Sequence, residues 1–336
     1  MNDAPDPRLE RFLREQGWLA DGEHANWTAL AGGVSSDIWR VDLPDGRRIC
    51  VKRALARLRV AATWHAPVSR NASEWAWIRF AARHLPQSVP EPLAHDPAAG
   101  LFAMAYLPPE RYPVWKSQLL DGRVEPATAA AVGRVLGTLH QASSDDARLA
   151  AQFATDDSFH ALRLEPYLLA TAHRHPAHAD ALRALVARTA ATRRALVHGD
   201  VSPKNVLVGP RGPVLLDAEC AWYGDPAFDV AFCLNHLLLK CLPRPGERAA
   251  LRRSFDAFVE SYFAAVRFEP RAELEARATA LLPGLLLARV DGKSPVEYLA
   301  GEAARNVVRG AAAPMIRMLP ATLAEVAARW HAALGA

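Results

Sequence analysis

Three oxygen-bearing side chains stand beside short apolar runs in ALVHGDVSPKNVLVGPRGPVLLDAEC, residues 195–220. Asp200 follows the first run, Asn205 precedes the second, and Asp217 ends the last. Carboxylate and amide oxygens suit Mg²⁺, which usually shares the phosphate oxygens of a substrate. We therefore expect Asn205 and Asp217 to bind the metal, and Asp200 to receive or orient the proton of an attacking hydroxyl.

This division of roles matches the template for phosphoryl transfer, in which an Asp serves the nucleophile and an Asn and a second Asp bind metal. The spacing from Asp200 to Asn205 equals that in the motif H-R-D-x-x-x-x-N. Phosphoryl transfer spreads charge over several oxygens, so positioning and cations supply most of its catalysis. The pattern therefore predicts a phosphotransferase that uses Mg²⁺.

The nucleotide phosphates also need a cation, and Lys52 in RICVKRA occupies a predicted strand, in the position of the Lys of V-A-I-K. Glu74, on the next predicted helix, is the carboxylate expected to hold it. Gly33, Ser35 and Ser36 lie at the tip between two predicted strands, where backbone N–H groups could cover phosphates. Each residue alone has an ordinary structural explanation, and it is their order and spacing that favour function.

The elements that must position these residues fall into two groups. Alternating apolar and polar residues predict strands at 27–31, 36–43, 47–53 and 101–107, and helical spacing predicts a helix at 71–85. The rest of the chain is mainly helical, with two short strands in the segment quoted above. We therefore predict an α+β fold with a small β-rich N-lobe, residues 1–105, and a larger helical C-lobe, residues 106–336.

The composition is that of an ordinary globular protein, with 51% hydrophobic and 23% charged residues. The net charge is +4, but basic and acidic residues are interleaved, so nucleic acid is not an expected partner. No apolar stretch approaches about 18 residues, and the first residues lack a signal-peptide pattern, so no membrane partner is expected. The four cysteines form no C-x-x-C pair, which is typical of reduced thiols in a cytoplasmic protein.

Lysine is rare in this chain. Of 40 basic residues only five are lysines, namely Lys52, Lys116, Lys204, Lys240 and Lys293. A retained lysine can mark a place where a compact charge on a thin stem is needed, although drift is the simpler explanation for any single one.

Two motifs point to a family. HGDVSPKNVL and LLDAECAWYGDPAFDVAF resemble the H-G-D-x-x-x-x-N and I-D-x-E-x-A-x-x-G-D-P-x-x-D-I-A segments of the aminoglycoside phosphotransferase and choline kinase superfamily. The resemblance extends from about residue 27 to residue 240. It implies a small-molecule kinase with a bilobal, protein-kinase-like fold, with ATP as co-substrate and Mg²⁺ as cofactor.

The resemblance implies roles for single residues. Asp200 would be the catalytic base or would orient the nucleophile, and Asn205 and Asp217 would bind Mg²⁺. Lys52, paired with Glu74, would contact the α- and β-phosphates of the nucleotide.

Further residues would hold the adenine and the loop. Backbone groups from Ala105 to Leu107 would bond the adenine edge, with Met104 against its ring. His198 would support the catalytic loop. Asp229 would cap the following helix and brace the same loop.

Departures from Ser/Thr protein kinases favour a small acceptor. Those kinases place a Lys two residues after the catalytic Asp, where this chain has Ser202, and Lys204 lies two residues further on. No D-F-G or A-P-E motif follows, since Asp217 is succeeded by Ala218 and Glu219. We therefore expect a metabolite or a drug as the acceptor rather than a protein.

The acceptor itself is left open among an aminoglycoside, an amino alcohol and a sugar. An aminoglycoside needs an acidic pocket, whereas this chain is net basic. A choline-like acceptor needs an aromatic cage, for which Trp115, Trp222 and Tyr223 are available, although packing is the commoner role of such residues. The pattern R-V-x-x-x-W at residues 59–64 resembles methylthioribose kinases, whose catalytic loop differs from the one found here.

Four residues are candidates for acceptor binding. Glu219 could reach metal or substrate, and a structural role explains it equally well. Asp291 opens the turn DGKSP between two predicted helices, where Arg289 or Lys293 could bind a phosphate or carboxylate of the acceptor. A plain helix-turn-helix explains that segment too. The alternative functions are a non-catalytic nucleotide-binding protein on a kinase scaffold and a methylthioribose-type sugar kinase.

Overall fold

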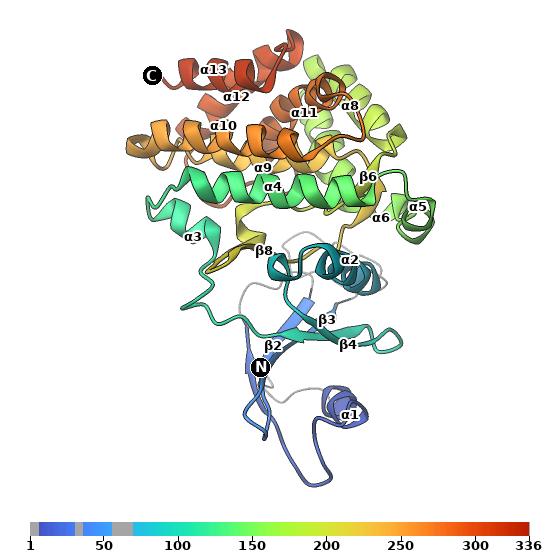
Figure 1. The fold of residues 1–336 in the computed structure, drawn as a ribbon. Coiled ribbons are helices and arrows are strands. Elements are labelled where there is room, and N and C mark those ends of the chain that lie inside the picture. Colours follow the sequence, from blue (N-terminus) through green and yellow to red (C-terminus); the bar gives the residue numbers. More distant parts are fainter. Residues whose placement is uncertain (1–6, 31–35, 56–69, 336) are drawn as a thin grey trace. The chain divides into compact units, whose positions relative to one another are not determined.

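The computed structural model describes residues 7–30, 36–55 and 70–335. The chain divides into two compact units, Met1–Pro108 and Pro109–Ala336, called here the first and the second unit (Figure 1). The boundary predicted from the sequence, after residue 105, lies three residues before this division.

The first unit is built on a five-stranded antiparallel sheet with the order β1-β2-β3-β5-β4. Its strands are β1 (Asn26–Ala29), β2 (Ser36–Asp42), β3 (Arg48–Ala54), β4 (Pro92–Asp96) and β5 (Leu101–Ala105). The tight turn between β2 and β3 contains Gly46 at φ +85°, a conformation that glycine adopts without strain. The other elements of this unit are α1 (Pro7–Glu15), α2 (Arg70–His84) and the 3₁₀ turn η1 (Pro86–Ser88).

Helix α1 forms a hydrophobic core with the sheet. Leu9 and Phe12 of α1 are buried in one cluster with Val41, Ile49 and Val51 of β2 and β3. Because Val41 and Ile49 are cross-strand partners, their side chains lie on the same face of the sheet. The helix therefore covers one face of β2 and of β3, the strand that carries Lys52.

Strand β4 was not predicted, because Pro90 and Pro92 are residues that usually interrupt regular secondary structure. Proline lacks the N–H that a central strand needs, but it is tolerated at an edge, at a first position and beside a bulge. β4 meets all three conditions: it is the outermost strand, it begins at Pro92, and its register with β5 shifts between Pro92 and Ala94.

The second unit is mainly helical. Its long helices are α4 (Pro126–Ser143), α8 (Ala179–Ala191), α9 (Ala227–Leu239), α10 (Arg248–Ala265), α11 (Arg271–Asp291), α12 (Glu302–Arg317) and α13 (Leu323–Ala333). Shorter ones are α3 (Trp115–Leu120), α5 (Ala147–Gln152), α6 (Asp156–Phe159), the π-helix η2 (His160–Leu169), α7 (Ala170–Arg174), η3 (Pro176–His178), η4 (Pro203–Asn205) and η5 (Pro245–Glu247). All thirteen residues of α9 are buried, so this helix is the centre of the unit.

Helices α4 and α10 lie side by side at close range (Figure 1). A Cβ atom at Gly133 of α4 would overlap the backbone of Phe258, and one at Gly137 would lie 2.7 Å from the carbonyl oxygen of Tyr262. The two glycines are therefore required by the approach of α10, and the helix itself does not need them.

Two antiparallel ribbons interrupt the helices, β6 (Ala195–Val197) with β9 (Trp222–Gly224) and β7 (Val206–Gly209) with β8 (Gly212–Leu215). The sequence predicted two strands here, and the structure has four, because each short strand needs a hydrogen-bonded partner. All four cysteines are buried thiols without a disulfide.

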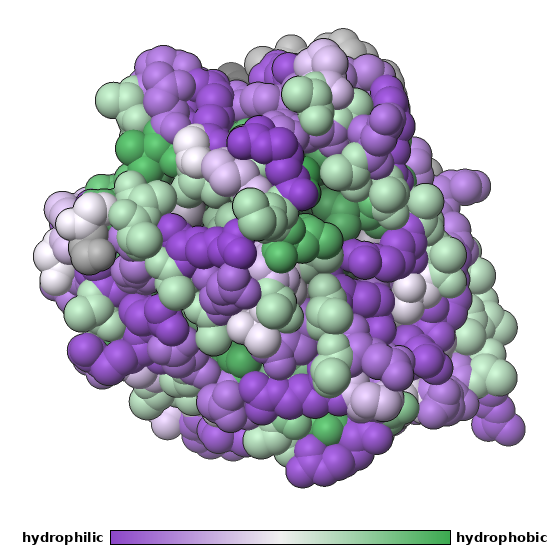
Figure 2. Space-filling model, turned by 90° about the horizontal axis from the view of Figure 1, so that it is seen from above, coloured by the Kyte–Doolittle hydropathy of each residue, from purple (hydrophilic) through white to green (hydrophobic). Residues whose placement is uncertain are grey.

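A helix that crosses a membrane must be both long and apolar. Within the described ranges no helix combines the length and the apolar character needed to span a bilayer. The face shown in Figure 2 is largely hydrophilic, with hydrophobic residues in small separate areas.

Candidate active site

The loop that carries Asp200 is held by a buried carboxylate of α9. Asp229 accepts hydrogen bonds from the backbone N–H groups of His198 (2.7 Å) and Gly199 (2.8 Å). The bracing contact expected of Asp229 is thus present, but the expected capping role is wrong. The first N–H of α9, on Ala227, donates instead to Asp225 (3.0 Å). Asp229 lies within the first turn, where its side chain can reach the loop.

The glycine of the H-G-D motif is required by its backbone. Gly199 has φ +78°, in the left-handed region, and a Cβ atom there would lie 2.5 Å from the carbonyl oxygen of Cys220. A side chain at this position would therefore be strained and would push the loop away from Cys220.

His198 joins the loop to the end of β8. Its Nδ1 accepts a hydrogen bond from the N–H of Asp200 (3.1 Å), so its Nε2 carries the proton and donates to the carbonyl oxygen of Leu216 (3.0 Å). Burial lowers the pKa of His198, although the carboxylates around it oppose this effect. The ring is therefore neutral and serves as a fixed link, as expected from the sequence.

The same network links the segments that carry Asp200, Asn205 and Asp217. The N–H of Leu216 donates to the carbonyl oxygen of Asn205 (2.9 Å), and Nδ2 of Asn205 donates to the carbonyl oxygen of Asp200 (3.1 Å). Asp217 follows Leu216 directly and has the left-handed φ of 67°. Non-glycine residues rarely adopt this conformation, which costs about 1–2 kcal/mol, and Asp tolerates it better than most.

The Asp200 carboxylate is flanked by two cations. Its Oδ2 lies 3.0 Å from Nη2 of Arg163 and 3.1 Å from Nζ of Lys204. Burial raises the pKa of Asp200, but the charges of Lys204 and Arg163 outweigh that effect and the net shift is downward. Asp200 is therefore ionised and is a weak base, better suited to orienting a hydroxyl than to removing its proton early.

Sequence reasoning missed both cations as partners of Asp200. Lys204 had a weak signal, because lysines are rare in this chain. Arg163 had none: it lies in the π-helix η2, an element that often occurs at functional sites but has no sequence signature. The Nε of Arg163 also donates to the carbonyl oxygen of Gly199, so the π-helix fixes both the backbone and the charge of the loop.

Asn205 and Asp217, the two predicted metal ligands, have oxygen atoms of the kind that suits Mg²⁺ shared with phosphates. Nδ2 of Asn205 is bound to the loop, so its amide oxygen is the atom that can face a cation. Residues 7–30, 36–55 and 70–335 contain no group of three or more His, Cys, Asp or Glu arranged to hold a metal. Two protein oxygens with the remaining positions filled by water and phosphate are typical of Mg²⁺ in nucleotide sites.

The first unit contains the predicted ion pair. Nζ of Lys52 on β3 lies 2.8 Å from Oε1 of Glu74 on α2, and both side chains are 3% exposed. Ser36 is buried at the start of β2, opposite Ala54. Gly33 and Ser35, and the R-V-x-x-x-W pattern at 59–64, lie outside the described residues.

At the end of β5, Met104 is buried and pairs with Cys50, and Leu107 is partly exposed. The N–H of Ala105 already donates to the carbonyl oxygen of Glu91 (2.9 Å), so Ala105 could offer an adenine only its carbonyl oxygen without losing that bond. The nucleotide roles of these residues stay predictions.

The predicted acceptor residues have partners within the second unit. Asp291 is bound by Arg309 (2.7 Å) and His175 (2.8 Å), which gives it a structural role in joining α11, α12 and α7. Lys293 pairs with Glu165 of η2 (2.7 Å). The contacts of Arg289 are described below. Glu219, two residues after Asp217, is half-buried, and its role stays a prediction.

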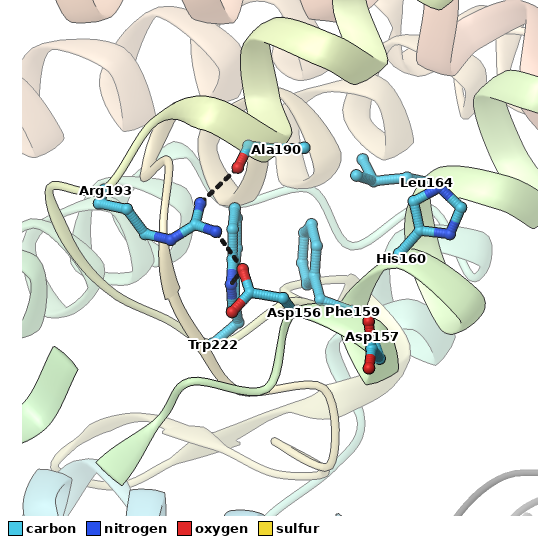
Figure 3. Close-up of a pocket in the computed structure, with 8 residues that line it drawn as sticks. All are labelled: Asp156, Asp157, Phe159, His160, Leu164, Ala190, Arg193 and Trp222. Carbon is cyan, nitrogen blue, oxygen red and sulfur yellow. Dashed lines mark hydrogen bonds and ion pairs between the residues drawn. The ribbon is translucent and has the colours of Figure 1, made fainter. Parts of the chain in front are cut away.

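The aromatic residues considered for a cage are packed. Trp115, Trp222 and Tyr223 are at most 5% exposed. In Figure 3 the Trp222 ring lies between Arg193 and Phe159. The guanidinium carbon of Arg193 is 4.6 Å from the centroid of the Trp222 ring, and the centroid of the Phe159 ring is 4.3 Å from it. A cavity of about 300 Å³ opens beside these side chains; Trp222 lines it, and none of the residues predicted for catalysis, metal binding or nucleotide binding does.

Comparison with known proteins shows the family to which this chain belongs. The model of the phosphotransferase enzyme family (APH) matches residues 26–268. Methylthioribose kinase from Escherichia coli is 28% identical over 239 residues, which are 62% of this chain and 57% of that protein. The chain thus spans little more than half the length of that curated relative.

Solved structures confirm the predicted fold. An amicoumacin kinase in complex with AMP-PNP and Ca²⁺ has a TM-score of 0.56 and 16% identity, covering 95% of this chain and 96% of its own. Ethanolamine kinase from Plasmodium vivax has a TM-score of 0.57 and 10% identity, covering 94% and 91%. The α+β, kinase-like architecture is therefore correct, and because the family model matches most of its length, the chain belongs to the phosphotransferase enzyme family.

Proposed function

We propose that this protein transfers the γ-phosphoryl group of Mg²⁺-bound ATP to a hydroxyl of a small molecule. The hydroxyl oxygen forms a bond to the γ-phosphorus, the bond to the β,γ-bridging oxygen breaks, and the hydroxyl proton leaves, so the products are ADP and a phosphate ester. The observation that carries the proposal is the loop in which Asp200, Asn205 and Asp217 are tied together through Leu216 and His198.

The catalytic roles follow from the contacts. Asp200 accepts the hydrogen bond of the acceptor hydroxyl and aims its oxygen; with a lowered pKa it takes the proton only late in the reaction. Asn205 and Asp217 would hold Mg²⁺, which supplies charge neutralisation at the phosphates. Lys52, oriented by Glu74, would bind the α- and β-phosphates.

Among the acceptors considered, we propose a sugar-like alcohol. The methylthioribose kinase relative supports a sugar. The absence of a free face on Trp222 argues against a choline cage built there, since Phe159 and Arg193 occupy both sides of its ring.

The test is ADP release with ATP and Mg²⁺ over a panel of sugars, amino alcohols and aminoglycosides. Asp200→Asn should lower kcat by about a hundredfold to ten-thousandfold while ATP affinity changes little. The matched control is Asp256→Asn, on the surface of α10, which should behave like the wild type. Full activity in Asp200→Asn would refute the role of Asp200. ATP binding without turnover on any acceptor would support the non-catalytic alternative instead.

A further inference from the structure

Two buried basic side chains of the second unit have no carboxylate partner among the described residues. Lys240, the C-cap residue of α9, is 0% exposed, and no atom of the described residues accepts a hydrogen bond from its Nζ. Arg289 of α11 is 7% exposed; its Nη1 donates to the hydroxyl of Tyr167 (3.1 Å) and to Ser294, and its Nε has no partner within the described ranges. Buried polar atoms without a hydrogen-bond partner are costly, so an anionic ligand that accepts from these two side chains would relieve that cost.

His236 completes a cluster with these two cations. It lies one turn before Lys240 on the same face of α9. Its Nδ1 is 3.2 Å from the hydroxyl of Tyr298, and its buried Nε2 has no hydrogen-bond partner in the part of the chain that is described. The Tyr298 ring also lies 4.5 Å from Nζ of Lys240. We call Lys240, His236 and Arg289 the basic cluster.

A short chain of contacts within the second unit joins the basic cluster to Asp200. Arg163, which binds Asp200, lies over the ring of Phe232, 6.0 Å from its centroid. The Phe232 ring contacts His236 (5.7 Å) on one side and Tyr167 (5.4 Å) on the other. Phe232 alone thus separates the basic cluster from the arginine that contacts Asp200.

Nearby acids do not neutralise the cluster. Glu297 pairs with Lys116, and Glu165 pairs with Lys293. Burial lowers the pKa of Lys240 to about 7. The groups that face Lys240 are Cys233 and His236 of α9, Arg289 of α11, Lys116 of α3, and Glu297 and Tyr298 of the segment after α11. Lys116 and Arg289 lower the pKa further, and Glu297 and Cys233 oppose them.

We propose that the basic cluster is a subsite for an anionic group, a carboxylate or a phosphate, on the acceptor that the enzyme phosphorylates; this rests on the proposed function. Nζ of Lys240, Nε of Arg289 and Nε2 of His236 donate to the anion. Tyr298 is partly exposed and covers Lys240, so the anion enters by displacing its ring.

The binding test uses anions that need neither ATP nor turnover. Inorganic phosphate and succinate are titrated separately into the full chain at constant ionic strength. The comparison shows whether the subsite prefers a phosphate or a carboxylate. Calorimetry at pH 7.5 in buffers of different ionisation enthalpy should show saturable binding of one of them, with uptake of about half to one proton per site as Lys240 becomes charged.

Lys240→Met and Lys240→Gln should both abolish this binding, and the second variant guards against a folding defect in the first. The control is Arg183→Met, an exposed cation of α8, which should bind like the wild type. No saturable binding, or equal binding by the Lys240 variants, overturns the proposal.

A kinetic test separates this proposal from the proposed function. Sugars are compared with their phosphate esters and their carboxylic acids, and the preferred anion should raise kcat/KM by about tenfold to a hundredfold, mostly through KM. In Lys240→Met, the kcat/KM values of the anionic acceptor and of the parent sugar should be nearly equal. Anion binding without turnover on any acceptor would refute the kinase and leave the subsite standing. Turnover without preference and without anion binding would refute the subsite alone.

Discussion

Replacing Lys240 by Met should stabilise the protein, and the gain should depend on pH. Methionine has nearly the volume of lysine and no charge, so it fits a site that is 0% exposed and offers Nζ no hydrogen bond from the described residues. The variant removes the cost of keeping an amine buried.

The size of the gain follows from the pKa, which falls from 10.5 to about 7 in the folded protein, chiefly through burial. Between these two values the unfolded chain binds a proton that the folded protein does not, so wild-type stability rises with pH in this window. At 1.36 kcal/mol per pKa unit, Lys240 costs about 4 kcal/mol at pH 7, about 3 at pH 8.5 and about 1 at pH 9.5. The advantage of Lys240→Met should shrink in the same order.

The measurement is urea unfolding of both proteins at these three pH values, in buffers without phosphate or carboxylates, followed by far-UV circular dichroism. The difference between the unfolding free energies of the two proteins removes the contribution of the other titrating groups, which both proteins share. Lys293→Met is the matched control, because Lys293 is 53% exposed and pairs with Glu165, so its removal should change stability by less than about 1 kcal/mol.

A difference that does not vary with pH, or a variant less stable than the wild type at pH 7, would show that Lys240 is charged and partnered in the folded protein. Either result would refute the reasoning from burial.

Lys52→Met should lower the unfolding free energy by about 3–5 kcal/mol in urea titrations, because it leaves the Glu74 carboxylate buried without its ammonium partner. The double variant Lys52→Met with Glu74→Leu should recover that stability without recovering ADP release, and recovery of both would contradict the assigned role of Lys52. Gly133→Ala should lower the thermal midpoint, because its new Cβ meets the backbone of Phe258, whereas Gly310→Ala on α12, where nothing lies within 4 Å, should raise stability by up to about 1 kcal/mol. Equal effects of the two substitutions would mean that α10 moves aside freely.

Sequence reasoning succeeded where local patterns carry the information. Alternation predicted β2 and β3, and a motif linked Lys52 to Glu74 across 22 positions. It failed where the outcome depends on tertiary context. The prolines of β4 are allowed only because the strand is at the sheet edge, a position that no local pattern reveals.

The active-site loop shows the same limit. The grouping of Asp200, Asn205 and Asp217 in one loop region could be predicted from spacing, because the H-G-D motif and the two apolar runs are contiguous. Arg163 could not, because its contact with Asp200 depends on how the π-helix packs. The burial of Lys240 was equally hidden, since a lysine after an apolar helix reads as a solvated end. For Asp229 the sequence predicted its contact with the loop correctly, but it also predicted that Asp229 caps α9, a role that Asp225 has instead.

Helix α9 also limits how acceptor preference can change. It runs from Asp229, which holds the catalytic loop, to Lys240 in the basic cluster, a rise of about 16 Å at 1.5 Å per residue. With no exposed residue, it cannot shift or bend without opening the core. If the basic cluster holds the acceptor as proposed, the helix fixes its distance from the Asp200 loop, and adaptation to longer or shorter acceptors is expected in the segment around Tyr298.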